Sequence, residues 1–141
     1  MATPGAEVFL DASYVIALAI PADEAHERAV ERADWLRRNP EIGLVTTQPV
    51  LLEIGNMLAK YRFRDAAVAV LDTVAQDPRI HVIPLTDDLY ADALSLFRQR
   101  KDKEWGMTDC VSFVVMQRRQ LREALTTDHH FEQAGFRALM R

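Results

Sequence analysis

The chain has 141 residues, a formal net charge of −4 and a single cysteine. A chain of this length buries enough apolar surface to fold without disulfides or a structural metal, and one cysteine excludes an internal disulfide. The longest apolar run, residues 15–20, is far too short to span a bilayer, and the first residues do not resemble a signal peptide. We therefore expect one domain over residues 1–141, flexible at residues 1–6, in a cytoplasmic protein with no membrane partner.

The first half of the chain predicts two strands and three helices. Pro21 ends the first helical pattern because proline cannot continue a helix, and Asp23 is the expected N-cap of the next one. The predicted strands are residues 8–10 and 43–46, and the predicted helices are residues 15–20, 23–38 and 49–61.

The second half predicts three more helices and three more strands. Thr86 and Thr108 each stand at the start of a helical pattern and are the expected N-caps of those helices. The predicted helices are residues 65–75, 86–100 and 108–119, and the predicted strands are residues 80–83, 124–127 and 136–140.

Short apolar strands that alternate with helices predict an α/β fold, with a parallel sheet and helices on both of its faces. In such sheets, ligands bind outside the carboxyl ends of the strands. Asp11 and Asp128 both stand at the end of a predicted strand, so we expect both carboxylates at that edge. A helix cap or an Asx turn is the structural alternative for each.

Glu53 lies in a strongly apolar helical segment, which predicts a helix that is buried nearly all round. A buried carboxylate must be paired, protonated or bound to a metal. The positions three and four residues away hold Pro49, Val50, Asn56 and Met57, so no local base is available for an ion pair. This favours a functional role for Glu53.

Asp109 opens the last long helix, where an acid can simply complement the helix dipole. That helix is apolar and belongs in the core, so its N-terminus is expected to meet the edge of the sheet. Four acids gathered there need neutralisation by protons or cations. Oxygen ligands select Mg²⁺ or Mn²⁺. Such a cation would also offset a negative net charge that by itself argues against binding nucleic acid.

The segments that carry these acids resemble, in order, the motifs of the PIN-domain nucleases, and especially the VapC-type toxins of toxin–antitoxin pairs. The acids follow the order Asp, Glu, Asp, Asp with gaps of 42, 56 and 19 residues, and the resemblance covers almost the whole chain. The segments are FLDAS at 9–13, LLE at 51–53, MTDCVSF at 107–113 and TDHHF at 127–131.

This resemblance implies a three-layer α/β/α sandwich with a short, mainly parallel central sheet. It also implies an endoribonuclease that depends on Mg²⁺ or Mn²⁺ and hydrolyses RNA phosphodiester bonds. The acids that it assigns to catalysis and metal binding are Asp11, Glu53, Asp109 and Asp128. The polar residues expected to support them are Ser13, Thr108 and Thr47, with Thr46 competing for the position of Thr47.

The same resemblance implies two protein partners. A nuclease of the toxin type needs an inhibitory antitoxin, and the resemblance also suggests a homodimer. Residues 14–20 with Trp35 are apolar enough to form the dimer contact, or they line the core.

Several residues near the motifs have two interpretations. Lys101 and Lys103 either form a rim that binds RNA phosphates or belong to a solvated helix end. We interpret His129 and His130 as loop residues, because an all-oxygen metal site needs neither. Cys110 is interpreted as an inert core thiol, since no base stands beside it.

Other functions stay open. An enzyme that forms an aspartyl-phosphate could use Asp11, but the usual second Asp two residues later is Ser13 here. A stand-alone PIN nuclease without an antitoxin, and a non-catalytic PIN module that binds RNA or protein, are also compatible with the motifs. Metal-dependent cleavage, with Asp11→Asn as control, separates a nuclease from a binding module.

Overall fold

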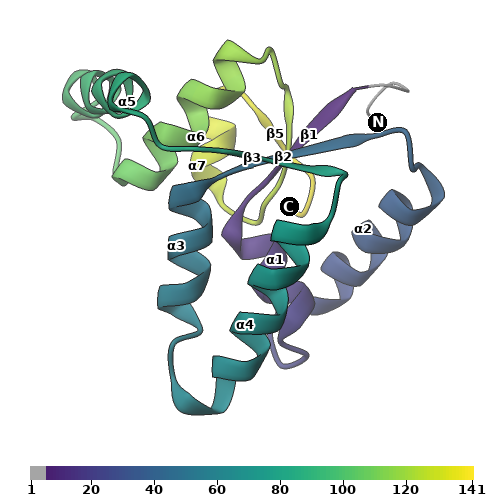
Figure 1. The fold of residues 1–141 in the computed structure, drawn as a ribbon. Coiled ribbons are helices and arrows are strands. Elements are labelled where there is room, and N and C mark those ends of the chain that lie inside the picture. The colour runs from purple at the N-terminus through teal and green to yellow at the C-terminus, as the bar shows by residue number, and fades with distance from the viewer. Residues whose placement is uncertain (1–5) are drawn as a thin grey trace.

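The computed structural model describes residues 6–141, so the flexibility expected at residues 1–5 lies outside the described part of the chain. A central sheet is covered by helices on both faces, as Figure 1 shows. In chain order the elements are β1 (Glu7–Leu10), α1 (Ala12–Ala19), α2 (His26–Arg38), β2 (Gly43–Thr47), α3 (Gln48–Met57), α4 (Tyr61–Gln76), β3 (Ile80–Ile83), α5 (Asp87–Gln99), α6 (Met107–Arg118), β4 (Glu123–Leu125), α7 (His129–Gln133) and β5 (Arg137–Ala138).

The sheet has five strands in the order β3-β2-β1-β4-β5, and every pairing is parallel. From β1 the chain winds outward to β2 and β3, whereas β4 pairs with the other side of β1. The direction of winding therefore reverses between β1 and β4. In an open parallel sheet this reversal leaves a crevice at the carboxyl ends of the two strands, and Asp11 directly follows β1 there.

Alternation along the strands divides the apolar residues between two cores. In β1, Phe9 packs with residues of α3, α5 and α6, whereas Val8 and Leu10 pack with residues of α1 and α2. This follows from the two-residue period of a strand, which sends successive side chains to opposite faces. The predicted three-layer α/β/α sandwich with a parallel sheet is confirmed.

Several predicted element boundaries were wrong. Helix α2 begins at His26 rather than at Asp23, because the Asp23 carboxylate accepts from the backbone N–H of Ala25 at 2.8 Å and closes a turn before the helix. The last strand is only Arg137–Ala138, since β4 offers it just two paired residues. Residues 58–60 separate α3 from α4, where one helix was expected to continue to residue 61.

The prediction that the helix of Glu53 is buried nearly all round was also wrong. Val50 and Ile54 are buried, but Leu52 and Met57 on the same helix are 67% and 60% exposed. Helix α3 packs through one face only, against α1, α4 and α6.

The dimer surface that we expected belongs to the core. Tyr14 and Trp35 are buried together with residues of β1, β2 and the C-terminal segment. The homodimer stays a prediction, but these side chains do not supply its contact surface.

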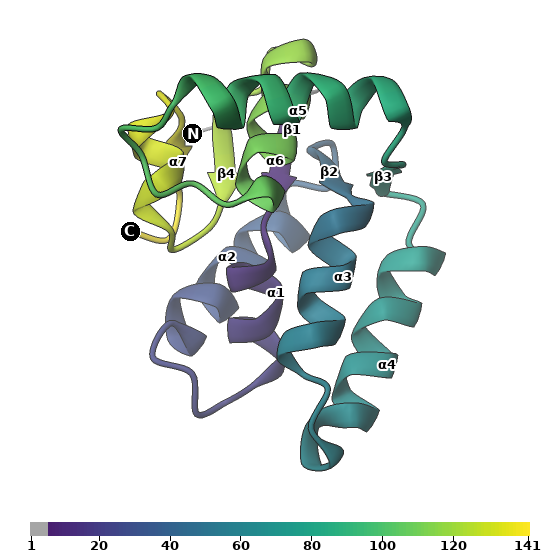
Figure 2. The same cartoon turned by 90° about the vertical axis from the view of Figure 1, so that its left-hand side faces the viewer.

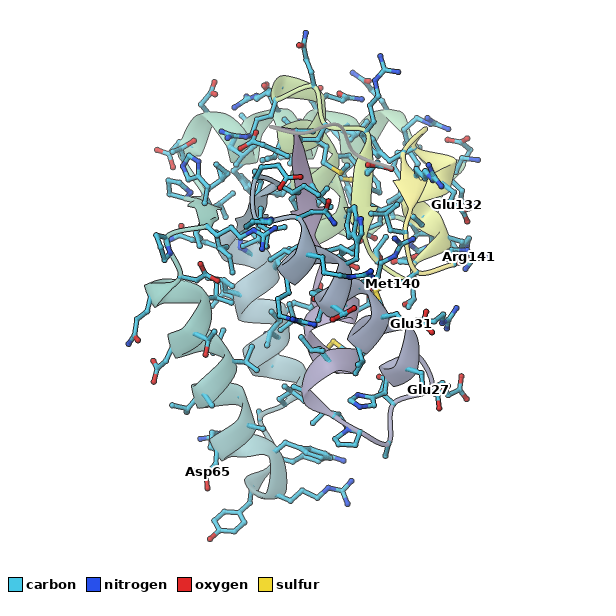
Figure 3. The ribbon with its side chains drawn as sticks, turned by 90° about the vertical axis from the view of Figure 1, so that its right-hand side faces the viewer. Glu27, Glu31, Asp65, Glu132, Met140 and Arg141 are labelled. Atoms are coloured by element: carbon cyan, nitrogen blue, oxygen red, sulfur yellow. The ribbon has the colours of Figure 1, made fainter. Side chains whose placement is uncertain are left out.

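Helix α2 fixes the C-terminal segment. Arg28 and Arg32 donate to the carbonyl oxygens of Met140 and Leu139 at 2.8 and 2.9 Å. Arg141 forms an ion pair with Glu132 of α7 at 2.7 Å, and Figure 3 shows these two side chains at the same corner of the molecule. Within residues 6–141, no helix has both the length and the apolar character needed to cross a membrane.

Candidate active site

Two hydroxyl groups orient Asp11 at the carboxyl edge of the sheet. The Asp11 residue is 6% exposed, and Oγ of Ser13 and Oγ1 of Thr126 donate to its Oδ2 at 2.9 and 2.7 Å. The backbone N–H groups of Thr127 and Asp128 donate to these same hydroxyl oxygens at 3.1 and 3.0 Å. The network therefore connects the end of β1 with the segment that follows β4.

Asp109 and Asp128 share a contact with His130. Nδ1 of His130 lies 3.3 Å from Oδ2 of Asp109 and 3.3 Å from Oδ1 of Asp128. Asp128 is the N-cap of α7, as its structural alternative predicted, and accepts from the N–H of His130 at 2.9 Å. Asp109 lies in the first turn of α6, where its structural alternative placed it, and accepts from the N–H of the N-cap Gly106 at 3.1 Å. Capping and a role in the site are thus compatible here.

Glu53 approaches the same place from α3. Its pKa is raised to about 7, first by burial and then by the negative charges of Asp11, Asp109 and Asp128, while a hydrogen bond with Thr108 opposes them. The four acids are therefore close enough to act on one another electrostatically.

Burial is also the main reason that Asp11 and Asp109 favour the proton. It raises the pKa of Asp11, against the opposing hydrogen bonds of Thr126 and Ser13. It likewise raises the pKa of Asp109, to which the charge of Asp128 adds. We expected mutual repulsion as the cause; repulsion contributes, but desolvation is larger.

This set of donors fits a divalent cation. Three carboxylates whose pKa is raised would each be stabilised in the ionised form by a positive charge between them. Carboxylate oxygens are the ligands that Mg²⁺ and Mn²⁺ prefer. Within the described residues, Asp128, His129 and His130 also offer ligand atoms within 4.8 Å of one another, a mixed set of oxygen and nitrogen.

The polar residues predicted to support the acids have separate functions. Thr47 is the N-cap of α3, and its Oγ1 accepts from the N–H of Val50 at 3.2 Å. It therefore fixes the start of the helix that carries Glu53. Thr46, the competing position, instead donates to the carbonyl of Leu10 at 2.8 Å and ties β2 to β1.

Thr108 is not the N-cap of α6 that we predicted. The helix begins one residue earlier, at Met107, with Gly106 as N-cap. The side chain of Thr108 is thereby free to bond to Glu53, which places it beside the acids as expected of a supporting residue.

Thr126 was not predicted as a supporting residue, and His129 and His130 were wrongly placed in a loop. His129 and His130 begin α7 rather than occupying a loop, because Asp128 caps that short helix. A signal for Thr126 was present, since a polar residue that ends a buried strand two positions before Asp128 must satisfy its hydroxyl nearby.

Lys101 and Lys103 lie in the loop between α5 and α6. Figure 2 shows this loop passing beside α7 before it enters α6. The two lysines line a separate pocket, together with Trp105 and Cys110, rather than standing among the acids. Cys110 is buried and burial raises the pKa of its thiol to about 11, which agrees with an inert core residue.

Residues 8–137 match the PIN domain family. The chain belongs to the PIN-domain family. Among its relatives is VapC20 of Mycobacterium tuberculosis, a 23S rRNA-specific endonuclease, found in strains H37Rv and CDC 1551. VapC20 is 28% identical over 129 residues, which are 92% of this chain and 95% of VapC20.

Solved structures of PIN-domain proteins share this fold. The crystal structure of VapC20, described as a sarcin–ricin loop cleaving toxin, matches with a TM-score of 0.80 and 27% identity, over 92% of this chain and 95% of that one. VapBC2 from Rickettsia felis, crystallised with a DNA fragment from its promoter, matches with a TM-score of 0.65 and 13% identity, over 94% of this chain and 96% of that one. The recognised resemblance to VapC-type PIN domains is confirmed.

Proposed function

We propose that this protein is a divalent-metal-dependent endoribonuclease and the toxin of a toxin–antitoxin pair. The observation that carries the proposal is that Asp11, Asp109 and Asp128 lie close enough to Glu53 for their charges to raise its pKa, at the edge where β1 and β4 end. The likeness to VapC20, an rRNA endonuclease, along 92% of the chain supports it.

The four acids would hold Mg²⁺ or Mn²⁺. A cation bound there supplies charge stabilisation for the phosphate and lowers the pKa of a water molecule. Ser13 and Thr126 keep Asp11 in a fixed orientation, so reorganising the site for the reaction costs little free energy. One of the site carboxylates would orient the attacking water or accept its proton.

The test is cleavage of a stem–loop RNA carrying the sarcin–ricin loop sequence by the purified protein. We expect cleavage with Mg²⁺ or Mn²⁺, none with EDTA, and a loss of at least 100-fold in Asp11→Asn, by analogy with removal of a single stabilising group. Ser95→Ala, on the exposed surface of α5, is the matched control and should cleave normally. A wild-type protein that binds this RNA but never cuts it would establish the binding-module alternative instead.

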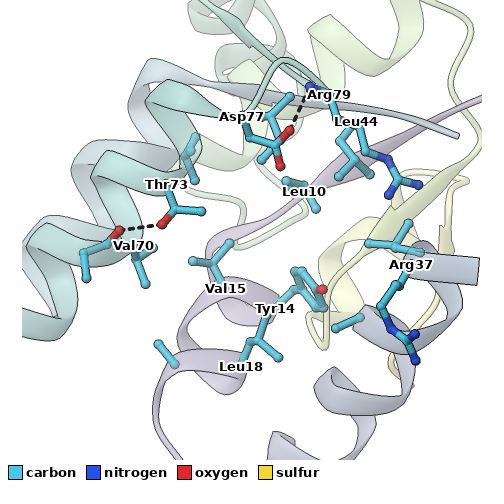
Figure 4. Close-up of a pocket in the computed structure, with 16 residues that line it drawn as sticks. Leu10, Tyr14, Val15, Leu18, Arg37, Leu44, Val70, Thr73, Asp77 and Arg79 are labelled. Atoms are coloured by element: carbon cyan, nitrogen blue, oxygen red, sulfur yellow. Dashed lines mark hydrogen bonds between the residues drawn. The ribbon is translucent and has the colours of Figure 1, made fainter. Parts of the chain in front are cut away.

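The inhibitory partner is proposed to bind an apolar groove between α1, α2 and α4. This groove has a volume of about 500 Å³, and Figure 4 shows Leu10, Tyr14 and Val15 along it, with Arg37 and Arg79 at one end. Leu10, which lines the groove, immediately precedes Asp11 in the sequence. The groove is suited to the apolar face of an antitoxin helix, from which a basic side chain could extend to the carboxylates.

Growth of a bacterial host tests this partner. Induced expression should arrest growth, Asp109→Asn should abolish the arrest, and co-expression of a small protein encoded by the neighbouring reading frame should relieve it. Leu18→Glu, in the groove, should prevent that relief, whereas Leu52→Glu on α3 should not. Harmless expression of a protein that still cuts RNA in vitro would reject the toxin role and leave a stand-alone nuclease.

A further inference from the structure

A second, basic pocket lies beside the acids, in the loop between α5 and α6. It has a volume of about 270 Å³. We call it the loop pocket, and it is lined by Phe97, Arg100, Lys101, Lys103, Trp105 and Cys110. None of these residues belongs to the quartet, and the proposed hydrolysis does not use them.

Arg100 is held in one orientation inside the loop pocket. Its guanidinium lies 4.9 Å from the ring centroid of Trp105, and its Nε and Nη2 donate to the two carboxylate oxygens of Asp102 at 3.0 Å each. A guanidinium has five N–H donors, so these two bonds leave the other three for a ligand. A planar guanidinium that is already immobilised loses little entropy when it binds a phosphate.

The pocket carries a positive surplus. Its lining holds three cations, Arg100, Lys101 and Lys103, and no acid. The same loop carries two acids, Asp102 and Glu104, and Arg100 lowers the pKa of Asp102. The Nζ of Lys103 lies 3.9 Å from the Asp102 carboxylate, which is near the limit of an ion pair. The ligand that complements this lining is an anion.

Phe97 indicates which kind of anion. It is 44% exposed at the mouth of the pocket, next to the bases. An exposed aromatic ring beside cationic side chains is the combination that binds single-stranded nucleic acid. Nucleobases stack on the ring while the phosphates of the same strand contact the cations. A free inorganic anion would gain nothing from Phe97.

The loop pocket is fixed to α6, which carries Asp109, and to α7, which follows Asp128. Trp105 donates from Nε1 to Oε1 of Gln133 in α7 at 3.0 Å and packs edge-on against Phe113 of α6, with ring centroids 4.9 Å apart. Cys110 of the pocket directly follows Asp109. A strand of RNA lying across the acids therefore has this pocket as its neighbour along α6 and α7.

We propose that the loop pocket binds the RNA backbone one or more nucleotides away from the scissile bond. Arg100, Lys101 and Lys103 contact a phosphate there, and Phe97 stacks on an adjacent base. This subsite rests on the proposed ribonuclease function, and it would select substrates that present an unpaired nucleotide at this distance from the cleaved bond.

The experiment measures RNA affinity separately from cleavage. A fluorescein-labelled stem–loop RNA with the sarcin–ricin loop sequence is titrated by anisotropy against the Asp11→Asn protein in Mg²⁺, at several salt concentrations. Adding Lys101→Gln and Lys103→Gln should raise Kd about tenfold and reduce the slope of log K against log salt by about 0.7, the contribution of one phosphate contact on a single strand. Phe97→Leu should raise Kd about tenfold and leave that slope unchanged.

The matched control is Lys60→Gln with Arg62→Gln, which removes the same charge from the exposed N-cap and first turn of α4. It should leave both Kd and the salt slope near their starting values. Equal changes of Kd in the two double variants would overturn the subsite and indicate general electrostatic attraction of the RNA to the whole surface. An unchanged Kd in the Lys101/Lys103 double variant would also overturn the subsite. Displacement of the RNA by millimolar inorganic phosphate alone would also overturn it.

Thermal unfolding of each variant excludes a folding defect. In otherwise wild-type protein, the loop-pocket pair should lower kcat/KM about tenfold, mainly through KM, because the lost contact is made in the ground state as well as the transition state. If the wild type does not cut RNA but the binding differences appear, the ribonuclease proposal fails while the subsite stands. If cleavage occurs and the binding differences are absent, only the subsite fails.

Discussion

At the scale of single residues, Thr126 is the most direct support of Asp11. Its hydroxyl gives the shorter of the two hydrogen bonds to Oδ2 of Asp11, at 2.7 Å, and it is completely buried. Without this donor, burial would raise the pKa of Asp11 further, and the ionised carboxylate that a cation requires would be harder to form.

We therefore predict that Thr126→Val weakens metal affinity about tenfold, the usual effect of removing a group that orients a metal ligand. The measurement is the Mn²⁺ concentration that gives half-maximal cleavage. Thr126→Ser should restore most of the loss, and Thr73→Val on the exposed side of α4 should have no effect. An unchanged Mn²⁺ requirement in Thr126→Val would show that Ser13 alone suffices.

Glu53 makes the stability of the metal-free protein depend on pH. Its pKa in the folded protein is about 7, above the ordinary value of 4.5. A carboxyl group with a raised pKa stabilises the fold in its protonated form, so its contribution is complete below pH 4.5 and is lost as the pH rises through 7. Asp11 and Asp109 act in the same direction, because their pKa values are also raised.

In EDTA we predict that the free energy of unfolding falls between pH 5 and pH 8. The share of Glu53 is about 1–2 kcal/mol, after allowance for solvent screening of a partly exposed group. Urea titrations at the two pH values measure it. Glu53→Gln should flatten the profile, whereas Glu104→Gln in the exposed α5–α6 loop should leave it as it is. A wild-type profile that rises with pH would contradict the raised pKa.

At the scale of elements, the starts of two helices decide where the acids stand. Helix α3 follows a buried N-cap, Thr47, and α6 begins at Met107 after its N-cap Gly106, so Asp109 lies in its first turn. The sequence pattern located the helices, but the N-cap of α6 lies two residues before the predicted one, and Thr108 is a partner of Glu53 instead of a cap. Successive positions on a helix point about 100° apart, so the identity of the cap matters for a site.

We predict that Thr47→Ala lowers the free energy of unfolding by about 1 kcal/mol and also lowers cleavage, because the cap positions the helix of Glu53. Thr86→Ala removes the equivalent cap of α5, whose Oγ1 accepts from Leu89 N–H at 3.1 Å. The Thr86→Ala variant should lose a similar amount of unfolding free energy and keep its cleavage rate within about twofold of wild type. Equal losses of activity in both variants would mean that stability, and not the position of Glu53, limits the enzyme.

At the scale of the whole molecule, the parallel sheet gathers residues that are far apart in the sequence. Asp11 and Asp128 come from neighbouring strands, whereas Glu53 and Asp109 come from helices that pack on the same face of the sheet. A cation shared by the four acids would thus connect β1, α3, α6 and α7. A cation that binds only the folded state must then stabilise the entire fold.

We predict that Mn²⁺ at about 100 times its Kd raises the unfolding free energy by roughly 2.7 kcal/mol and the thermal midpoint by about 10 °C. Differential scanning fluorimetry at pH 7.5 measures the shift. Asp109→Asn should lose most of it, and Asp87→Asn, on the exposed first turn of α5, should keep it. A midpoint that ignores both Mn²⁺ and EDTA would contradict a preformed metal site.

The sequence by itself determined the α/β class and the order of the acids. Apolar strands and amphipathic helices are local patterns, and Asp11 and Asp128 could be placed at strand ends because parallel strands end at one edge. The four acids could also be named, since each lies in a recognisable motif. Local patterns do not record which faces meet, however, so the exposed side of α3 was missed and the burial of Trp35 was left open.

Only the tertiary structure decided which groups surround the acids. Thr126 bonds to Asp11 across 115 positions of the chain, His130 meets Asp109 across the α6–α7 contact, and Trp105 fixes the loop pocket to α7 through Gln133. These contacts depend on how the elements pack, and a side chain's neighbours in space are not encoded by its neighbours in sequence. The acids were therefore predictable, whereas the groups that orient them and the basic pocket beside them were not.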